Sequence, residues 1–536
     1  MPRVLNGCRG SIRKRQSRMR KLHFDNRFVR ELPGESGGGD VPRAVEHAVY
    51  SLVDPVPMPA PTLLSWSPEA AALIDLDAGD IDAAFLDLFS GREPVEGAQP
   101  FAGNYGGHQF GHWAGQLGDG RAITLGEVVN AQGARWELQL KGSGRTPYSR
   151  GADGRAVLRS SLREYLCSEA MHHLGVPTTR ALCLVGTGEQ VVRDMFYDGH
   201  PQAEPGAIVC RMAPSLLRFG HFELPASRGD TRLLEQLVEF TIDRDFPELS
   251  GHGRARRAEW FTEICARTAR MIAAWMRVGF VHGVMNTDNM SVLGLTIDYG
   301  PYGWIEPYDP DWTPNTTDAQ RRRYRFGQQP NVAYWNLGCL AAALSPVVGD
   351  DEALQKGLQH YADTLERESR SSHARKLGLD QFRDDDLPLL QELHALMQQA
   401  QMDMTRTFRS LIDIDVRRPS MESLEGTFYD SALRAEYEEP LRNWLVRYAK
   451  RIDADALDAD TRQQRMQAAN PCYVPRNYLA HQAIERAEQG DLQTLENLLD
   501  VLRQPYVEQP GRDEYAARRP DWAAQRAGCS MLSCSS

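Results

Sequence analysis

The stretch that decides the fold lies near the middle of the chain. It reads VHGVMNTDNM at residues 281–290, followed by LTIDYG at residues 295–300. An apolar segment enters a compact polar loop that carries Asp288 and Asn289, and a second apolar segment runs into Asp298. Carboxylate and amide oxygens are hard ligands that suit Mg²⁺ or Mn²⁺ bridging phosphate oxygens. The loop therefore predicts metal and nucleotide chemistry, although Asp-Asn and Asp-Tyr-Gly are also common turn sequences.

The order of these residues is similar to that in protein kinases. A kinase catalytic loop reads His-Arg-Asp, four residues, Asn, and is followed by Asp-Phe-Gly, which places Asn289 and Asp298 at the two metal-binding positions. The base aspartate of kinases then falls on Val284, which cannot accept a proton. Asp288 is the nearby carboxylate. Either the base has moved to Asp288 or the chain performs a different reaction.

A predicted strand with the sequence ELQLK ends at Lys141. Kinases use a lysine in this place to contact phosphates and orient it with a glutamate of the following helix. Glu164 and Glu169 both lie on the helix predicted over residues 159–174. The lysine alone is weak support, because most lysines at strand ends are simply solvated, but the downstream loop strengthens the interpretation.

Glycines and arginines supply further candidates for phosphate binding. Residues 115–121 read GQLGDGR, and glycines there let backbone N–H groups approach a phosphate. Arg211 and Arg218 stand seven residues apart and can hold phosphate oxygens bidentately, the alternative being two surface salt bridges. His108 and His112 stand four apart, but no third ligand accompanies them, so we do not expect zinc at this pair.

Composition sets the broad class. The chain has 536 residues, of which 42% are hydrophobic and 25% charged, as is usual for a soluble globular protein. Its net charge of −11 argues against a general nucleic-acid binder. No run reaches the roughly 18 apolar residues of a membrane span, so no membrane partner is expected. Nine scattered cysteines do not form a secreted disulfide framework.

Residues 1–21 are rich in arginine and lysine and contain no Asp or Glu. Such a segment is typical of an organelle-targeting peptide, of a disordered tail or of a sequence upstream of a start at Met19. We expect a cytoplasmic protein if the source is bacterial and allow a mitochondrial one if it is eukaryotic.

The pattern along the chain predicts an α+β, protein-kinase-like two-lobed fold with a glycine-rich β N-lobe and a mainly helical C-lobe. Strands are expected at 122–129, 136–141, 181–196 and 206–213, and helices at 159–174, 230–245 and 258–278. The expected regions are a basic tail (1–21), an N-terminal extension packing on the core (22–100), the N-lobe (101–225), the C-lobe with the polar loop (226–350) and a helical C-terminal region (351–536).

Together these motifs resemble the selenoprotein O family, protein adenylyltransferases with a pseudokinase fold. The resemblance runs from about residue 22 to the C-terminus and rests on the segments 107–111, 118–126, 137–144, 146–150, 153–161 and 282–303. It implies that ATP binds reversed relative to kinases and that AMP passes to a Ser, Thr or Tyr hydroxyl of a target protein while pyrophosphate leaves. UTP is a second possible donor.

The resemblance also implies roles for single residues. Asp288 is the proposed base, and Asn289 and Asp298 are the ligands of Mg²⁺ or Mn²⁺. The remaining positions are the phosphate-binding Lys141 oriented by Glu164, the nucleotide contacts Gly118, Gly120, Arg121, Asp153 and Gly154, and the outer-phosphate pair Arg211 and Arg218.

Two questions stay open at this point. Cys534 occupies the place of the family's selenocysteine, and since residues 311–315 contain no cysteine, pairing with Cys529 and plain surface exposure are the alternatives. The competing functions are a conventional kinase, which Val284 disfavours, and a catalytically inactive binding module. The latter is disfavoured by the presence of Lys141, Asn289 and Asp298.

Overall fold

The computed structural model describes residues 22–35 and 37–533. The predictions for the basic segment 1–21 and for Cys534 fall outside these residues. Cys529 is described and is buried, so surface exposure, one of the two alternatives, does not hold for this residue. The tail instead packs against the segment that follows Asp298, where the Leu532 backbone N–H donates to the carbonyl of Pro314 at 3.0 Å.

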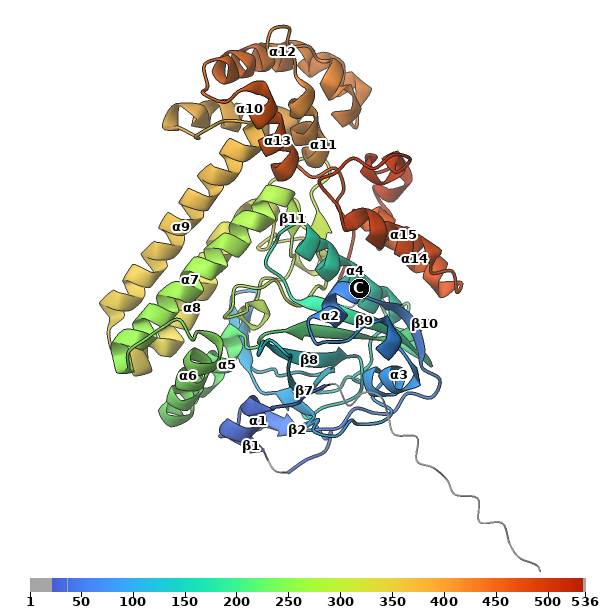
Figure 1. The fold of residues 1–536 in the computed structure, drawn as a ribbon, viewed down its shortest axis with the longest axis vertical. Helices are drawn as coiled ribbons and strands as arrows, with labels where there is room; N and C mark the ends of the chain where they lie inside the picture. The colour runs from blue at the N-terminus through green and yellow to red at the C-terminus, as the bar shows by residue number, and fades with distance from the viewer. Residues whose placement is uncertain (1–21, 36, 534–536) are drawn as a thin grey trace, which may run out of the picture.

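The N-lobe is built on one eight-stranded sheet with the order β1-β2-β4-β7-β8-β10-β9-β3 (Figure 1). All neighbours in it are antiparallel except β1 and β2. The strands are β1 Gly34–Glu35, β2 Tyr50–Leu52, β3 Thr62–Trp66, β4 Phe101–Gly103, β7 Ala122–Val129, β8 Arg135–Lys141, β9 Arg180–Arg193 and β10 Gln202–Ala213. Segments before residue 70 therefore supply strands to the same sheet as the glycine-rich region.

Burial on both faces explains the central strands. Helix α4 (Leu158–His173) packs against β9 and β10 on one face of the sheet, and α2 (Pro68–Ala72) and α3 (Ala83–Phe89) pack on the other face in the core that includes Leu125 of β7 and Leu138 of β8. The four strands and the helix predicted for this lobe are confirmed within one or two residues at most ends, although β10 begins at Gln202 rather than 206.

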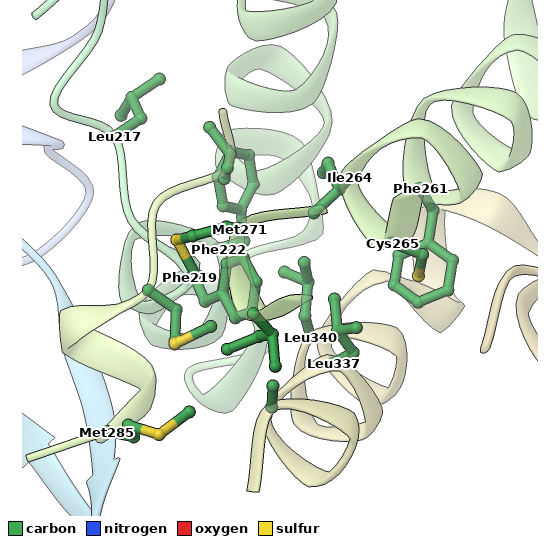
Figure 2. Packing of buried hydrophobic residues seen from close by; sticks show 14 of the residues in the cluster. Leu217, Phe219, Phe222, Phe261, Ile264, Cys265, Met271, Met285, Leu337 and Leu340 are labelled. Atoms are coloured by element: carbon green, nitrogen blue, oxygen red, sulfur yellow. The ribbon is translucent and has the colours of Figure 1, made fainter. Parts of the chain in front are cut away.

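The C-lobe consists of long helices packed side by side in Figure 1. They are α5 Phe219–Ser227, α6 Thr231–Asp245, α7 Gly253–Val278, α8 Gln329–Val348 and α9 Asp351–Leu377. Figure 2 shows their shared core, in which Phe222 of α5 and Ile264 of α7 lie beside Leu337 of α8. Met285 of the polar loop belongs to the same core, so its packing against the helices holds the loop in place.

Helix α7 leads directly into β11 and the polar loop. It ends at Gly279, whose φ of +79° is left-handed and suits glycine as a helix C-cap. The short strand β11 (Phe280–Val281) pairs with β12 (Gly303–Trp304) and holds the two ends of the loop together. Residues Thr287–Asn289 form a single 3₁₀ turn between them.

One segment, Phe326–Val348, is long and apolar enough to cross a membrane by length and composition alone. More than half of it is buried inside the protein, where α8 packs against α5, α7 and α9. Burial in the C-lobe core accounts for its composition.

The C-terminal region is helical, as predicted. Helices α10 Leu387–Gln399, α11 Met404–Ser410, α12 Ser431–Asp453 and α13 Ala459–Ala469 enclose a second core. Helices α14 Asn477–Glu488 and α15 Gln493–Leu502 return to pack on α4 of the N-lobe. The α+β, two-lobed class is confirmed, with the C-terminal helices bracing both lobes.

Candidate active site

A cleft of about 770 Å³ lies where the sheet meets the polar loop. Its lining includes every site residue predicted from the sequence except Glu164, which lies behind Lys141. Side chains from β8 and β10, the turns around residues 118–121 and 148–155, and the loop that follows β11 converge on it. Segments separated by almost 200 residues in the sequence thus face one cavity.

Lys141 reaches the cleft from the end of β8. Its Nζ donates to Glu164 Oε2 at 2.5 Å, and Glu164 Oε1 accepts from Arg211 at 2.9 Å. Burial would raise the pKa of Glu164, but Lys141 and Arg211 hold it below its usual value. Glu169, the other candidate on α4, pairs with Arg180 instead. The helix therefore presents one ionised carboxylate to the cleft lysine.

Asp298 lies between two guanidinium groups. Arg211 and Arg218 both donate to its carboxylate, and both arginine side chains are buried. Burial alone would raise the pKa of Asp298, but the two arginines hold it well below its usual range, so the group is ionised. Its φ of +55° is unusual for a residue other than glycine and turns the carboxylate toward the cleft lining.

Asp288 lines the same cleft, but its pKa is raised rather than lowered. Burial raises its pKa to about 7, against the lowering influence of Gln109 and Arg218. Gln109 Nε2 donates to Oδ2 at 3.1 Å, whereas Oδ1 is buried with no hydrogen-bond partner among the residues described. A carboxylate of this kind can exchange a proton near neutral pH, as a general base requires.

Asn289 uses its amide N–H group to hold the loop, donating to the carbonyl of Val284 at 2.9 Å. The amide oxygen then remains as a ligand atom on the cleft. Together with the ionised Asp298 it offers the hard oxygen donors that a divalent metal prefers. The residues present therefore fit a divalent ion bound with the phosphates.

Close packing leaves no room for a side chain at three glycines of the cleft. A Cβ at Gly118, which has a φ of +73°, would lie 2.3 Å from the ring of Tyr148, and one at Gly154 would lie 2.1 Å from the carbonyl oxygen of Gly144. Gly120 faces the backbone of Tyr148 in the same way. These turns close only with glycine, and that closure brings their backbone to the cleft.

Asp153 and Arg121 line the outer part of the cleft. Asp153 is exposed and forms a bidentate ion pair with Arg193, and Arg150 and Arg155 stand on the same rim. The rim is therefore basic overall, in keeping with an anionic ligand.

Sequence reasoning missed three residues of this site. Asp119 is buried beside Arg218 and accepts from the backbone N–H of Gly103, and burial raises its pKa. Gln139 accepts from Arg211 at 2.7 Å. Strand alternation signals Gln139, because it lies two residues before Lys141 and shares its face. Gln109 lies in the GHQFG segment, but nothing in the sequence indicates that it contacts Asp288.

Comparison with known proteins agrees with this geometry. The family described as protein adenylyltransferase SelO matches residues 43–503. Proteins named protein nucleotidyltransferase YdiU from Azoarcus sp. (strain BH72) and Xanthomonas euvesicatoria pv. vesicatoria (strain 85-10) are each 63% identical over 519 residues, which is 97% of this chain and all of the relative. The same name belongs to a protein of Aromatoleum aromaticum with 61% identity over 523 residues, again 97% of this chain and all of the relative.

Among solved structures, ROP2 from Toxoplasma gondii, a virulence factor described as having a protein-kinase fold and no enzymatic activity, aligns with 76% of this chain and 87% of its own. Its identity is 13% and its TM-score 0.21, too low to carry an argument. The family match and the full-length relatives carry the assignment: the chain belongs to the SelO family of protein adenylyltransferases.

Proposed function

We propose that this chain transfers AMP from ATP to the hydroxyl group of Ser, Thr or Tyr side chains in target proteins and releases pyrophosphate. The observation that carries the proposal is the pair of buried arginines, Arg211 and Arg218, beside Asp298 at the inner end of the cleft. The name of the relatives, protein nucleotidyltransferase, supports the same class of reaction.

The charge distribution favours a triphosphate that enters with its outer phosphates innermost. A buried guanidinium fork binds phosphate oxygens bidentately, and two forks with Lys141 can neutralise the charge of a pyrophosphate leaving group. The α-phosphate then faces the side of the cleft that carries Asp288. A kinase needs a carboxylate at the position of Val284 to receive the hydroxyl proton, and valine offers none.

In the proposed reaction the acceptor hydroxyl oxygen attacks the α-phosphorus, and the bond from this phosphorus to the bridging oxygen of the β-phosphate breaks. Asp288 receives the hydroxyl proton on its carboxylate, which Gln109 holds in place. Arg211, Arg218 and Lys141 stabilise the charge that develops on the leaving pyrophosphate. Electrostatic stabilisation is the larger contribution, because attack on such a phosphate is loose and demands little of the base.

Asn289 and Asp298 would hold Mg²⁺ or Mn²⁺ when the nucleotide is bound, and the ion would supply charge neutralisation at the phosphates. Nucleotidyltransferases generally use a divalent metal, and hard oxygen ligands accept either ion. UTP is included in the proposal as a second donor, because the interactions named here contact phosphates rather than a base.

The test uses ATP radiolabelled either at the α or at the γ phosphate, incubated with the chain, Mn²⁺ or Mg²⁺ and a mixture of soluble proteins. We expect label on protein only from the α position, and none with an Asp298→Ala variant. Label retained only from the γ position would instead identify a kinase.

A further inference from the structure

A second group of ligand-type side chains lies on the opposite side of strand β5 (Gly106–Gln109) from Asp288. His108 of β5, Glu223 of α5 and Cys339 of α8 place one potential ligand atom each within 4.8 Å of one another. His108 Nδ1 lies 2.7 Å from Glu223 Oε1. Among the residues that the structure describes, it is the one group of three or more His, Cys, Asp or Glu side chains whose spacing suits a metal ion.

Glu223 gives an independent sign that a ligand is bound here. Its side chain is only 3% exposed, and its Oε2 atom has no hydrogen-bond partner among the described residues. A buried carboxylate oxygen without a partner loses its hydration with nothing in exchange, so such atoms usually have a partner such as an ion or an ordered water.

The elements that carry the three side chains are held rigidly. Helices α5 and α8 pack together through the core in Figure 2, where Phe219 and Phe222 of α5 lie near Leu337 and Leu340 of α8. His108 is placed by its backbone N–H, which donates to Thr287 Oγ1 at 2.7 Å, and its ring packs on Trp113 and Trp335. The cluster is therefore organised before any ion arrives.

We propose that His108, Glu223 and Cys339 bind one Zn²⁺ ion, at a site separate from the one at Asn289 and Asp298. A thiolate, an imidazole and a carboxylate are the ligand types of zinc, and thiolate disfavours Mg²⁺. Ligand atoms around tetrahedral zinc lie roughly 3.3–3.7 Å apart, so small side-chain rotations close the present spacing. Binding releases the thiol proton of Cys339 to water, and the two ligand charges balance the ion.

The position of the site links it to the catalytic loop. Alternate residues of a strand face opposite sides, so Gly107 and Gln109 face Asp288 while His108 faces Glu223. An ion on His108 would fix β5 against α5 and α8 and so steady the Gln109 contact to Asp288. The inference does not rest on the transfer reaction proposed above.

Alkylation of cysteines tests the site in the intact chain. After treatment with a chelator, the protein is reacted with iodoacetamide with and without one equivalent of Zn²⁺, and each cysteine is followed by peptide mass spectrometry. We expect zinc to slow the labelling of Cys339 at least about tenfold. Cys472, which is also a free and half-buried cysteine, is the internal control and should not change. Equal labelling of Cys339 in both samples would overturn the proposal.

Cobalt(II) as a probe gives a second, spectroscopic readout. Thiolate coordination produces a near-ultraviolet charge-transfer band, which we expect in the wild type and in Cys472→Ser but not in Cys339→Ser. Glu223→Gln should weaken the band at least about tenfold at limiting Co²⁺, because the amide carries no charge to balance the ion. A band that survives Cys339→Ser, or no band in the folded wild type, would show that the group is only a hydrogen-bonded His108–Glu223 pair beside an inert thiol.

Discussion

The cleft and the C-terminal helical region each bury an aspartate against arginine, but they do so in different ways. In the cleft, Asp298 lies between Arg211 and Arg218 and remains 19% exposed at its side chain. In the C-terminal region, Asp403 is fully buried, accepts two hydrogen bonds from Arg476 at 2.8 and 2.9 Å, and caps the first turn of α11. Tyr429 adds a further hydrogen bond to the same carboxylate.

The difference lies in what is left for a ligand. The carboxylate of Asp403 has its hydrogen-bond acceptors engaged by protein groups, so the pair links α11 to the start of α14, and Arg476 also lies 3.6 Å from Glu306 Oε1. In the cleft, one carboxylate is shared by two guanidinium groups, and all three groups line an open cavity. The closed pair, Asp403 with Arg476, contributes to stability, whereas the open group, Asp298 with Arg211 and Arg218, can still bind a ligand.

The largest expected effect follows from removing the shared carboxylate. Asp298→Asn keeps the shape of the side chain but removes its charge, and with it the metal ligand proposed above, which would be worth several kcal/mol in the transition state. We expect the rate of AMP transfer to fall about a thousandfold while the thermal midpoint changes little, because Arg211 keeps Glu164 and Gln139 as acceptors and Arg218 keeps the carbonyl of Asp288. Asp403→Asn is the matched control: we expect its thermal midpoint to fall and its rate of AMP transfer per folded molecule to stay unchanged. A folded Asp298→Asn enzyme with wild-type turnover would refute the metal assignment.

Next in size is the loss of the closed pair. Arg476→Met leaves Asp403 as a buried carboxylate without its cation, and we expect the free energy of unfolding to fall by about 3–5 kcal/mol. Urea unfolding monitored by circular dichroism measures it. Turnover per folded molecule should be unchanged, since Arg476 does not line the cleft. A variant that is as stable as the wild type but inactive would mean that this pair also serves the reaction.

A third prediction concerns a buried amino group that pairs with no acidic side chain among the residues described. Lys376 is 4% exposed, donates to the backbone carbonyl of Arg277 at 2.9 Å, and lies 4.1 Å from the ring centre of Phe408. Burial, with a smaller contribution from Arg277, lowers its pKa to about 7. The histidines that line the same small cavity, His373 and His394, have lowered pKa values for the same reason.

The sign of the effect follows from proton linkage. The unfolded chain binds a proton at Lys376 up to its ordinary pKa of 10.5, and the folded chain loses it near pH 7. Stability from this group is therefore present at high pH and is lost as pH falls toward 7. We expect Lys376→Met to be about 2 kcal/mol more stable than the wild type at pH 6.5 and to lose this advantage progressively as pH rises from about 7 toward 10.5. Urea midpoints measure the difference, and Lys450→Met on exposed α12 should show none.

The contrast between the two regions also explains what the sequence could predict. The lobes, the central strands and the long helices follow from periodicity and caps, which are local, as with α7 ending at Gly279. The residues Lys141, Asp288, Asn289 and Asp298 stand in motifs with fixed spacing. By contrast, Arg476 and Asp403 look like any surface pair in the sequence, because their burial depends on how α11 and α14 meet. The His108–Glu223–Cys339 group was missed for the same reason: its members lie 115 or more residues apart.

The smallest effect is expected at the rim of the cleft. Asp153 is assigned to nucleotide contact by family resemblance, yet its side chain is 47% exposed and engaged by Arg193. Exposed ion pairs are worth about 0–1 kcal/mol, so Asp153→Asn should change kcat/KM for ATP by less than about fivefold, mostly through KM. Asp198→Asn, an exposed acid on the neighbouring turn, is the control. A loss of a hundredfold in kcat would place Asp153 in direct contact with the phosphates or their metal. The ligand-binding part of the cleft would then extend to its rim.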